Sequence, residues 1–200
     1  MSKVDQIEDM MDTIARQWGR VDVLVNNAGI QHVAPVESFP VERWDAVIAI
    51  NLSSAFHTTR LALPAMQAAN WGRILFIASE SGLLPPAEMI HYGMTKSAQL
   101  AISRGLAEHT RGTGVTVNSV LPGPTRSEGI VEFIRSVVAD KDAPEAEREA
   151  AFFKEMRPLS LIRRLIEAEE IAATVAFLAS RAADFITGAT IDLNGGVLMI

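Results

Sequence analysis

Tyr92 and Lys96 stand four residues apart within residues 91–98. On a helix, residues four apart lie on one face, so the ammonium of Lys96 can sit near the phenol of Tyr92. A free tyrosine has a pKa of about 10 and is a poor base at neutral pH, and a nearby cation lowers that pKa. The pair therefore predicts a general acid/base that moves a proton on or off a substrate oxygen.

Other polar groups accompany the pair at the ends of, or within, apolar runs. Ser79 precedes Tyr92 by thirteen residues and follows the apolar run 74–78. Asn51 lies within the apolar run 48–52. Two further motifs follow the runs 21–25 and 115–121; they are Asn26-Asn27-Ala28-Gly29 and Pro122-Gly123-Pro124-Thr125.

The elements that must position these residues alternate between short apolar strands and amphipathic helices. Apolar residues at helical spacing predict a helix over residues 4–18 that ends at Gly19. Pro40 and Glu42 signal the start of a long helix over 41–69, with a kink at Pro64. The remaining expected elements are strands at 21–26, 73–79, 115–121 and 187–193, and helices at 90–111 and about 168–180. This alternation predicts an α/β fold with a doubly wound parallel sheet.

Composition narrows the classes of function. Two hundred residues suit one domain, which we expect to span 1–200. The net charge of −6, without a long basic run, argues against nucleic acid as a partner, and no apolar run approaches the ~18 residues of a membrane span. The chain has no cysteine, which fits a cytoplasmic location. Its four histidines show no metal-ligand spacing, so we expect no metal.

In this order and spacing, the motifs resemble those of the short-chain dehydrogenase/reductase family, and the resemblance covers essentially the whole chain. It implies that Tyr92 is the catalytic acid/base, that Lys96 lowers its pKa, and that Ser79 hydrogen-bonds the substrate oxygen. It also implies that Asn51 holds a backbone kink and a water that links Lys96 to solvent. By the same resemblance, NAD or NADP would contact Asn26, Ala28, Gly29, Tyr92, Lys96, Pro122, Gly123 and Thr125. Residues 126–160 would form an insertion that covers the substrate, the alternative being a solvated helix pair.

Residues 26–74 look closely like the D-3-hydroxybutyrate dehydrogenases. In those enzymes the glutamine after the Asn-Asn-Ala-Gly motif helps to hold the substrate carboxylate, and Gln31 matches it. They also use a histidine and a lysine at the positions that here are Ser81 and Met89. Desolvating a carboxylate without its partners is expensive, so we expect a small substrate other than hydroxybutyrate, in contact with Gln31, Ser81 and Met89.

The Gly-rich turn between a strand and a helix that holds a dinucleotide pyrophosphate is not found in these 200 residues. The resemblance therefore predicts a partial Rossmann-like sheet that lacks the N-terminal Gly-rich βαβ unit, with weak or absent dinucleotide binding. The strand at 21–26 would then be an exposed apolar edge, and we expect a homo-oligomer that covers it.

Two other functions stay open at this point. Ser79, Tyr92 and Lys96 could serve as nucleophile, base and tuning cation of a cofactor-independent ester hydrolase, although no Gly-x-Ser-x-Gly motif surrounds Ser79. Alternatively, the chain could be a non-catalytic, truncated remnant of an oxidoreductase whose exposed edge drives assembly.

Overall fold

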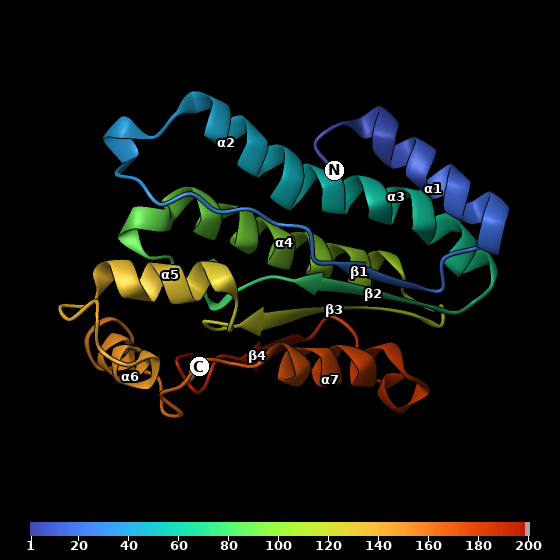
Figure 1. The fold of residues 1–200 in the computed structure, drawn as a ribbon. Coiled ribbons are helices and arrows are strands. Elements are labelled where there is room, and N and C mark those ends of the chain that lie inside the picture. Colours follow the sequence, from blue (N-terminus) through green and yellow to red (C-terminus); the bar gives the residue numbers. More distant parts are fainter. Residues whose placement is uncertain (199–200) are drawn as a thin grey trace.

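The structure, a computed structural model, describes residues 1–198. Helices alternate with strands along the chain (Figure 1). The α-helices are α1 (Val4–Trp18), α2 (Val41–Val47), α3 (Ser54–Ala68), α4 (Ile90–His109), α5 (Glu128–Val137), α6 (Glu145–Met156) and α7 (Ala168–Ala179). The strands are β1 (Val23–Asn26), β2 (Gly72–Ile77), β3 (Val115–Pro122) and β4 (Thr190–Leu193). Short 3₁₀ turns cover Val36–Ser38, Glu80–Gly82, Ala87–Met89 and Arg181–Ala183.

The four strands form one parallel sheet in the order β1-β2-β3-β4. All eight residues of β3 are buried, as expected for a parallel strand that is covered on both faces. The predicted α/β fold with a parallel sheet is confirmed. Each predicted strand is present, with bounds that differ by one to three residues from those expected.

The two faces of the sheet carry different helices. Ile74 and Phe76 of β2 pack with residues of α1, α3 and α4 in one core cluster. Leu75, which alternates with them, packs in a second cluster with Leu178 of α7. Successive side chains of a strand point to opposite faces, so α7 covers the face opposite to α1, α3 and α4 (Figure 1).

The predicted long helix over 41–69 is helical throughout but not uniform. A π-helical segment, Ile48–Ser53, separates α2 from α3 and contains Asn51. The helix changes type at this π-helical segment and not at Pro64, where a kink was expected. α3 continues through Pro64 to Ala68. Such π-turns are rare and occur frequently at functional sites.

β1 is an edge of the sheet, as expected. Val23 and Val25 are 37% and 39% exposed, and within residues 1–198 only β2 pairs with this strand. The apolar strand therefore presents unpaired backbone groups at its outer side.

The segment expected to cover the substrate folds into α5 and α6 (Figure 1). It has its own small core, in which Phe152 and Phe153 of α6 pack with Ile134 of α5. Arg126, ahead of α5, forms ion pairs with Glu145, Glu149 and Glu167 and so ties α6 to the residue that caps α7.

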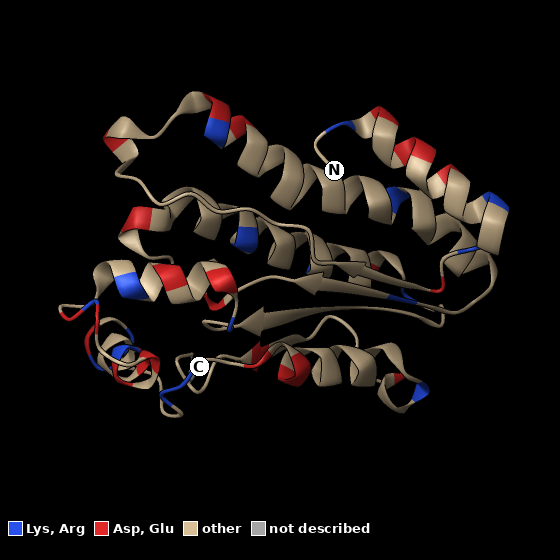
Figure 2. Cartoon of the chain, in the orientation of Figure 1, with Lys and Arg blue, Asp and Glu red and all other residues tan. Residues whose placement is uncertain are grey.

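Charged side chains are interspersed in sign over the outer helices and loops of the described chain, without a continuous basic stripe (Figure 2). Among residues 1–198, no helix combines the length and the apolar character needed to cross a membrane.

Candidate active site

A cleft of about 750 Å³ opens at the carboxyl ends of β1, β2 and β3. Its walls come from the loops that follow these strands, from α4, and from α5, α6 and α7. Ten of the residues expected from the sequence line it, namely Gly29, Gln31, Ser79, Ser81, Met89, Tyr92, Lys96, Pro122, Gly123 and Thr125. Asn26, Ala28 and Asn51 are not among the lining residues. Ligands of open α/β sheets bind at this end of the strands.

Ser79 stands at the start of the loop that follows β2. Its Oγ accepts a hydrogen bond from the backbone N–H of Ser81 at 3.1 Å, which caps the 3₁₀ turn Glu80–Gly82. This loop packs closely on α4, because a Cβ on Gly82 would lie 3.0 Å from the carbonyl carbon of Lys96. The glycine three residues after Ser79 thus lets the serine approach the tyrosine helix.

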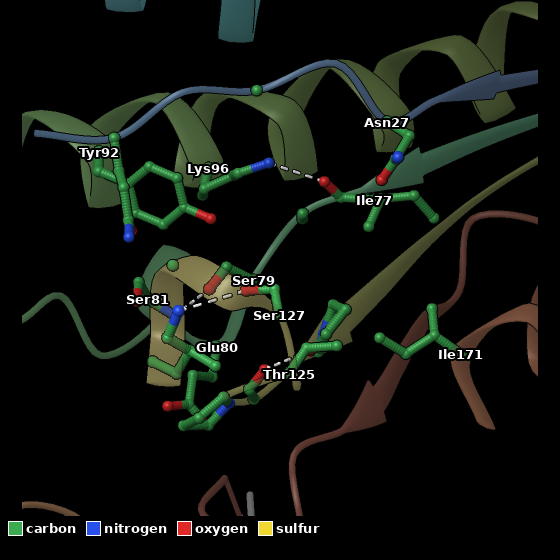
Figure 3. Close-up of a pocket in the computed structure, with 18 of the residues that line it drawn as sticks. Asn27, Ile77, Ser79, Glu80, Ser81, Tyr92, Lys96, Thr125, Ser127 and Ile171 are labelled. Carbon is green, nitrogen blue, oxygen red and sulfur yellow. Dashed lines mark hydrogen bonds between the residues drawn. The ribbon is translucent and has the colours of Figure 1, made fainter. Parts of the chain in front are cut away.

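Tyr92 and Lys96 extend from α4 toward the pocket, with Ser79 and Glu80 on the loop after β2 (Figure 3). Burial raises the pKa of Tyr92 above its usual value, the hydroxyl of Ser79 opposes this rise, and the charge of Glu80 adds to it. The pKa shift of Tyr92 is therefore opposite to the lowering expected from the sequence.

The ammonium of Lys96 hydrogen-bonds to groups other than Tyr92. Its Nζ donates to the carbonyl oxygen of Ile77 at 2.7 Å (Figure 3). It also donates to Oε1 of Gln99 at 3.3 Å. It lies 5.4 Å from the centre of the Tyr92 ring. Burial lowers the pKa of Lys96 to about 8. Desolvation therefore dominates at both residues, and it disfavours the charged form of each.

Asn51 is fully buried and acts on the backbone beside the cleft. Its Oδ1 accepts from Ile30 N at 2.8 Å, and its Nδ2 donates to Ile30 O at 2.9 Å and to Thr95 Oγ1 at 3.3 Å. Gln99, a partner of Lys96, donates to the carbonyl of Asn51. The structure thus gives Asn51 a positioning role for the loop after β1.

Asn26 and Ala28, two of the expected cofactor contacts, are not among the residues that line the cleft. Asn26 is buried; its Nδ2 donates to Thr59 Oγ1 at 3.1 Å, and its Oδ1 accepts from Thr58 Oγ1 at 2.7 Å. These bonds tie the end of β1 to α3, because both amide atoms are taken up by α3. Asn27, the next residue, lines the cleft instead.

The expected substrate contacts differ in exposure. Gln31 is exposed at the cleft, whereas Ser81 and Met89 are buried in its wall. Thr125, expected near the cofactor, donates from Oγ1 to the carbonyl of Gly123 at 3.0 Å.

Two charged residues of the cleft received no role from the sequence. Glu80 follows Ser79 directly, and Arg157 follows α6; both line the cleft. Nε of Arg157 lies 3.6 Å from Oε1 of Glu80. Burial raises the pKa of Glu80 to about 7, although the charge of Arg157 opposes the rise. In the sequence, the position of Glu80 directly after the candidate serine Ser79 could have pointed to this charged pair.

The sequence is similar to those of known oxidoreductases over nearly its whole length. The family model described as enoyl-(acyl carrier protein) reductase matches residues 1–198. The chain is 42% identical over 200 residues to the uncharacterized oxidoreductase YvrD of Bacillus subtilis, covering 99% of this chain and 75% of that protein. It is 41% identical to the D-beta-hydroxybutyrate dehydrogenase of Cupriavidus necator, covering 98% and 75%. It is 32% identical to the 3-oxoacyl-[acyl-carrier-protein] reductase FabG of Thermotoga maritima, covering 98% and 73%.

Proposed function

Because this chain belongs to the short-chain dehydrogenase/reductase family of oxidoreductases, we propose that it moves hydride between NAD or NADP and a small carbonyl or alcohol. The supporting observation is that Ser79, Tyr92 and Lys96 line one cleft at the carboxyl ends of the strands. A proton donor, a hydrogen-bonding hydroxyl and a buried cation are the groups that carbonyl reduction needs.

In the proposed reaction, Tyr92 donates its phenolic proton to the carbonyl oxygen of the substrate, and Ser79 donates a hydrogen bond to that oxygen. When bound in its reduced form, the nicotinamide supplies the hydride. The raised pKa keeps Tyr92 protonated at neutral pH, which suits an acid in the direction of reduction. In the reverse direction Tyr92 must first lose its proton, so alcohol oxidation is expected to gain more from alkaline pH.

The residues present fit the nicotinamide end of such a cofactor. A volume of about 750 Å³ lies within the usual range of ligand pockets. Tyr92 and Lys96 would hold ribose hydroxyls, and Pro122, Gly123 and Thr125 would meet the carboxamide. A Cβ on Gly29 would lie 3.8 Å from Lys96 Nζ, so glycine keeps this side of the ammonium open.

The pyrophosphate has no comparable site among residues 1–198. Gly112 and Gly114 lie in the turn that leads into β3, and Gly195 and Gly196 pack against the side chains of residues 160–162. We therefore propose that the 200-residue chain binds dinucleotides weakly, through the nicotinamide end.

A cofactor-free ester hydrolase receives less support from the geometry. Ser79 Oγ accepts a backbone N–H, and the ammonium of Lys96 donates to Ile77 instead of contacting Ser79. Neither arrangement activates the serine as a nucleophile.

The test is reduction of a panel of small ketones with NADH and NADPH. We expect Tyr92→Phe to lower kcat/KM by at least about a hundredfold, the low end of general acid–base effects. Ser79→Ala should also lose activity, whereas Ser136→Ala, an exposed serine on α5, should keep it. Turnover that survives Tyr92→Phe would refute the assignment, and ester hydrolysis without nucleotide would favour the hydrolase. A wild type without any turnover, in a folded protein, would favour the inactive remnant.

We also propose that a second copy of this chain covers the outer side of β1, since an exposed apolar edge strand favours pairing with another chain.

A further inference from the structure

Glu80 places an incompletely paired carboxylate in the wall of the cleft. The residue is only 7% exposed and directly follows Ser79. Among residues 1–198, no group donates a hydrogen bond to its buried Oε2. Natural structures leave few buried polar atoms unpaired, so such an atom in a ligand cleft calls for a partner.

The surroundings of Glu80 satisfy it only in part. Nε of Arg157 is 3.6 Å from Oε1, beyond a normal hydrogen bond. Arg157 also donates from Nη1 to the carbonyl of Met156, and its guanidinium lies 5.5 Å from the ring centre of Phe152. On the other side, a Cβ on Gly123 would stand 3.1 Å from Oε2, so this oxygen lies close to the backbone of Gly123, which donates no hydrogen bond to it.

A substrate carboxylate would be badly placed here. Above about pH 7, where Glu80 is ionised, it would have to approach a negative charge, and like charges at a shared site oppose each other. The charge of Arg157 is already directed at Glu80, so an acid reaching for Arg157 would meet both. Ser81 and Met89, which also line the cleft, are uncharged and offer an acid no counter-ion.

We propose that Glu80 makes this cleft select a carbonyl substrate whose second polar group is neutral and donates hydrogen bonds, such as a carboxamide or a hydroxyl. The inference rests on the proposed oxidoreductase function and specifies its substrate class. A donor N–H or O–H supplies the hydrogen bond that the Glu80 carboxylate lacks.

The test compares two ligands of nearly equal shape, 3-oxobutanamide and 3-oxobutanoate, bound to the full 200-residue chain at about pH 8, where Glu80 is ionised. Ligand-observed NMR titration measures their affinities and requires no turnover. The variants are Glu80→Gln, which keeps the shape and removes the charge, and Glu155→Gln, a matched change at an exposed position of α6. Circular dichroism of each variant verifies that it is folded.

We expect wild type and Glu155→Gln to bind the amide about tenfold more tightly than the acid, equivalent to about 1.4 kcal/mol. In Glu80→Gln this preference should fall to within about twofold, because the charge that excludes the acid is gone and an amide acceptor remains. A preference that is unchanged in Glu80→Gln overturns the inference. A wild type that binds the acid more tightly than the amide also overturns the inference. So does a wild type that binds neither ligand at a ligand concentration of about 10 mM, because ordinary ligands bind more tightly than that.

Failure of the proposed function would look different. If the amide preference depends on Glu80 but no ketone is reduced with either nucleotide, the selectivity of the cleft stands and the hydride-transfer reaction is refuted.

Discussion

Replacing Glu80 by glutamine is expected to change how the stability of this fold depends on pH. Burial raises the pKa of Glu80 from 4.5 to about 7, so the folded state holds this proton more tightly than the unfolded chain does. The stability contributed by the protonated carboxyl is complete below about pH 4.5, declines as the pH rises, and is lost above about pH 7.

The magnitude follows from the pKa difference. At about 1.36 kcal/mol per pKa unit, the whole shift corresponds to about 3 kcal/mol, of which about 2 kcal/mol falls between pH 5.5 and pH 8. Glu80→Gln carries no titrating proton, so its free energy of unfolding lacks this decline. The difference between the variant and wild type should therefore grow by about 2 kcal/mol in favour of the variant as the pH rises from 5.5 to 8.

Urea denaturation at several pH values, followed by circular dichroism, measures this difference. All other titrating groups cancel because each pH compares the two proteins directly. Glu155→Gln on the exposed side of α6 serves as the control and should track wild type. A difference between Glu80→Gln and wild type that stays constant within about 0.5 kcal/mol over this range would mean that Glu80 is not desolvated as described.

Further predictions concern the other residues of the site and the sheet edge. Tyr92 is the one tyrosine of the chain, so the ultraviolet absorbance of phenolate reports it alone; its titration should lie above the usual value and move further up in Ser79→Ala. Asn51→Ala leaves both backbone groups of Ile30 without their partner and should cost about 2–4 kcal/mol in urea denaturation, with a loss below 1 kcal/mol contradicting its positioning role. Calorimetric titration with NADH should give no Kd tighter than about 1 mM, and micromolar binding would reveal a phosphate site elsewhere. The chain should sediment as a dimer or larger, and Val23→Lys should shift it toward monomer, because edge lysines oppose strand pairing.

The regular elements could be predicted because local signals set them. The apolar stripe of residues 4–18 and the following Gly19, which has a φ of +84°, mark a helix and its end, and α1 has those bounds. The motif residues could be assigned to one site because parallel strands end at one edge of a sheet. The cleft indeed contains Ser79, Tyr92 and Thr125 from different parts of the chain.

What escaped prediction depends on contacts between distant segments. The π-helical turn around Asn51 has no local sequence signal, since apolar residues surround it as they would in an α-helix. Arg157 reaches Glu80 only because α5 and α6 fold over the cleft. The predicted lowering of the Tyr92 pKa was wrong for a related reason. Spacing along a helix predicts that Lys96 is near, but the degree of burial is a tertiary property.

The distribution of helices over the two faces of the sheet bears on the order in which the chain folds. The crossover from β2 to β3 runs through α4 on one face, and that from β3 to β4 runs through α7 on the other, while the strands step in one direction. Two such crossovers have opposite handedness, so one of them is left-handed, which is rare for connections between parallel strands.

The connection from β3 to β4 is also the longest in the sheet, since Ser119 pairs with Thr190. Contacts between residues far apart in sequence form slowly, because the entropy of closing the loop must be met first. We therefore expect β1, β2 and β3 with α3 and α4 to assemble early and β4 to dock last. The segment that covers the cleft lies within this late connection, so a folding intermediate would hold Tyr92 and Ser79 together before it has a closed pocket.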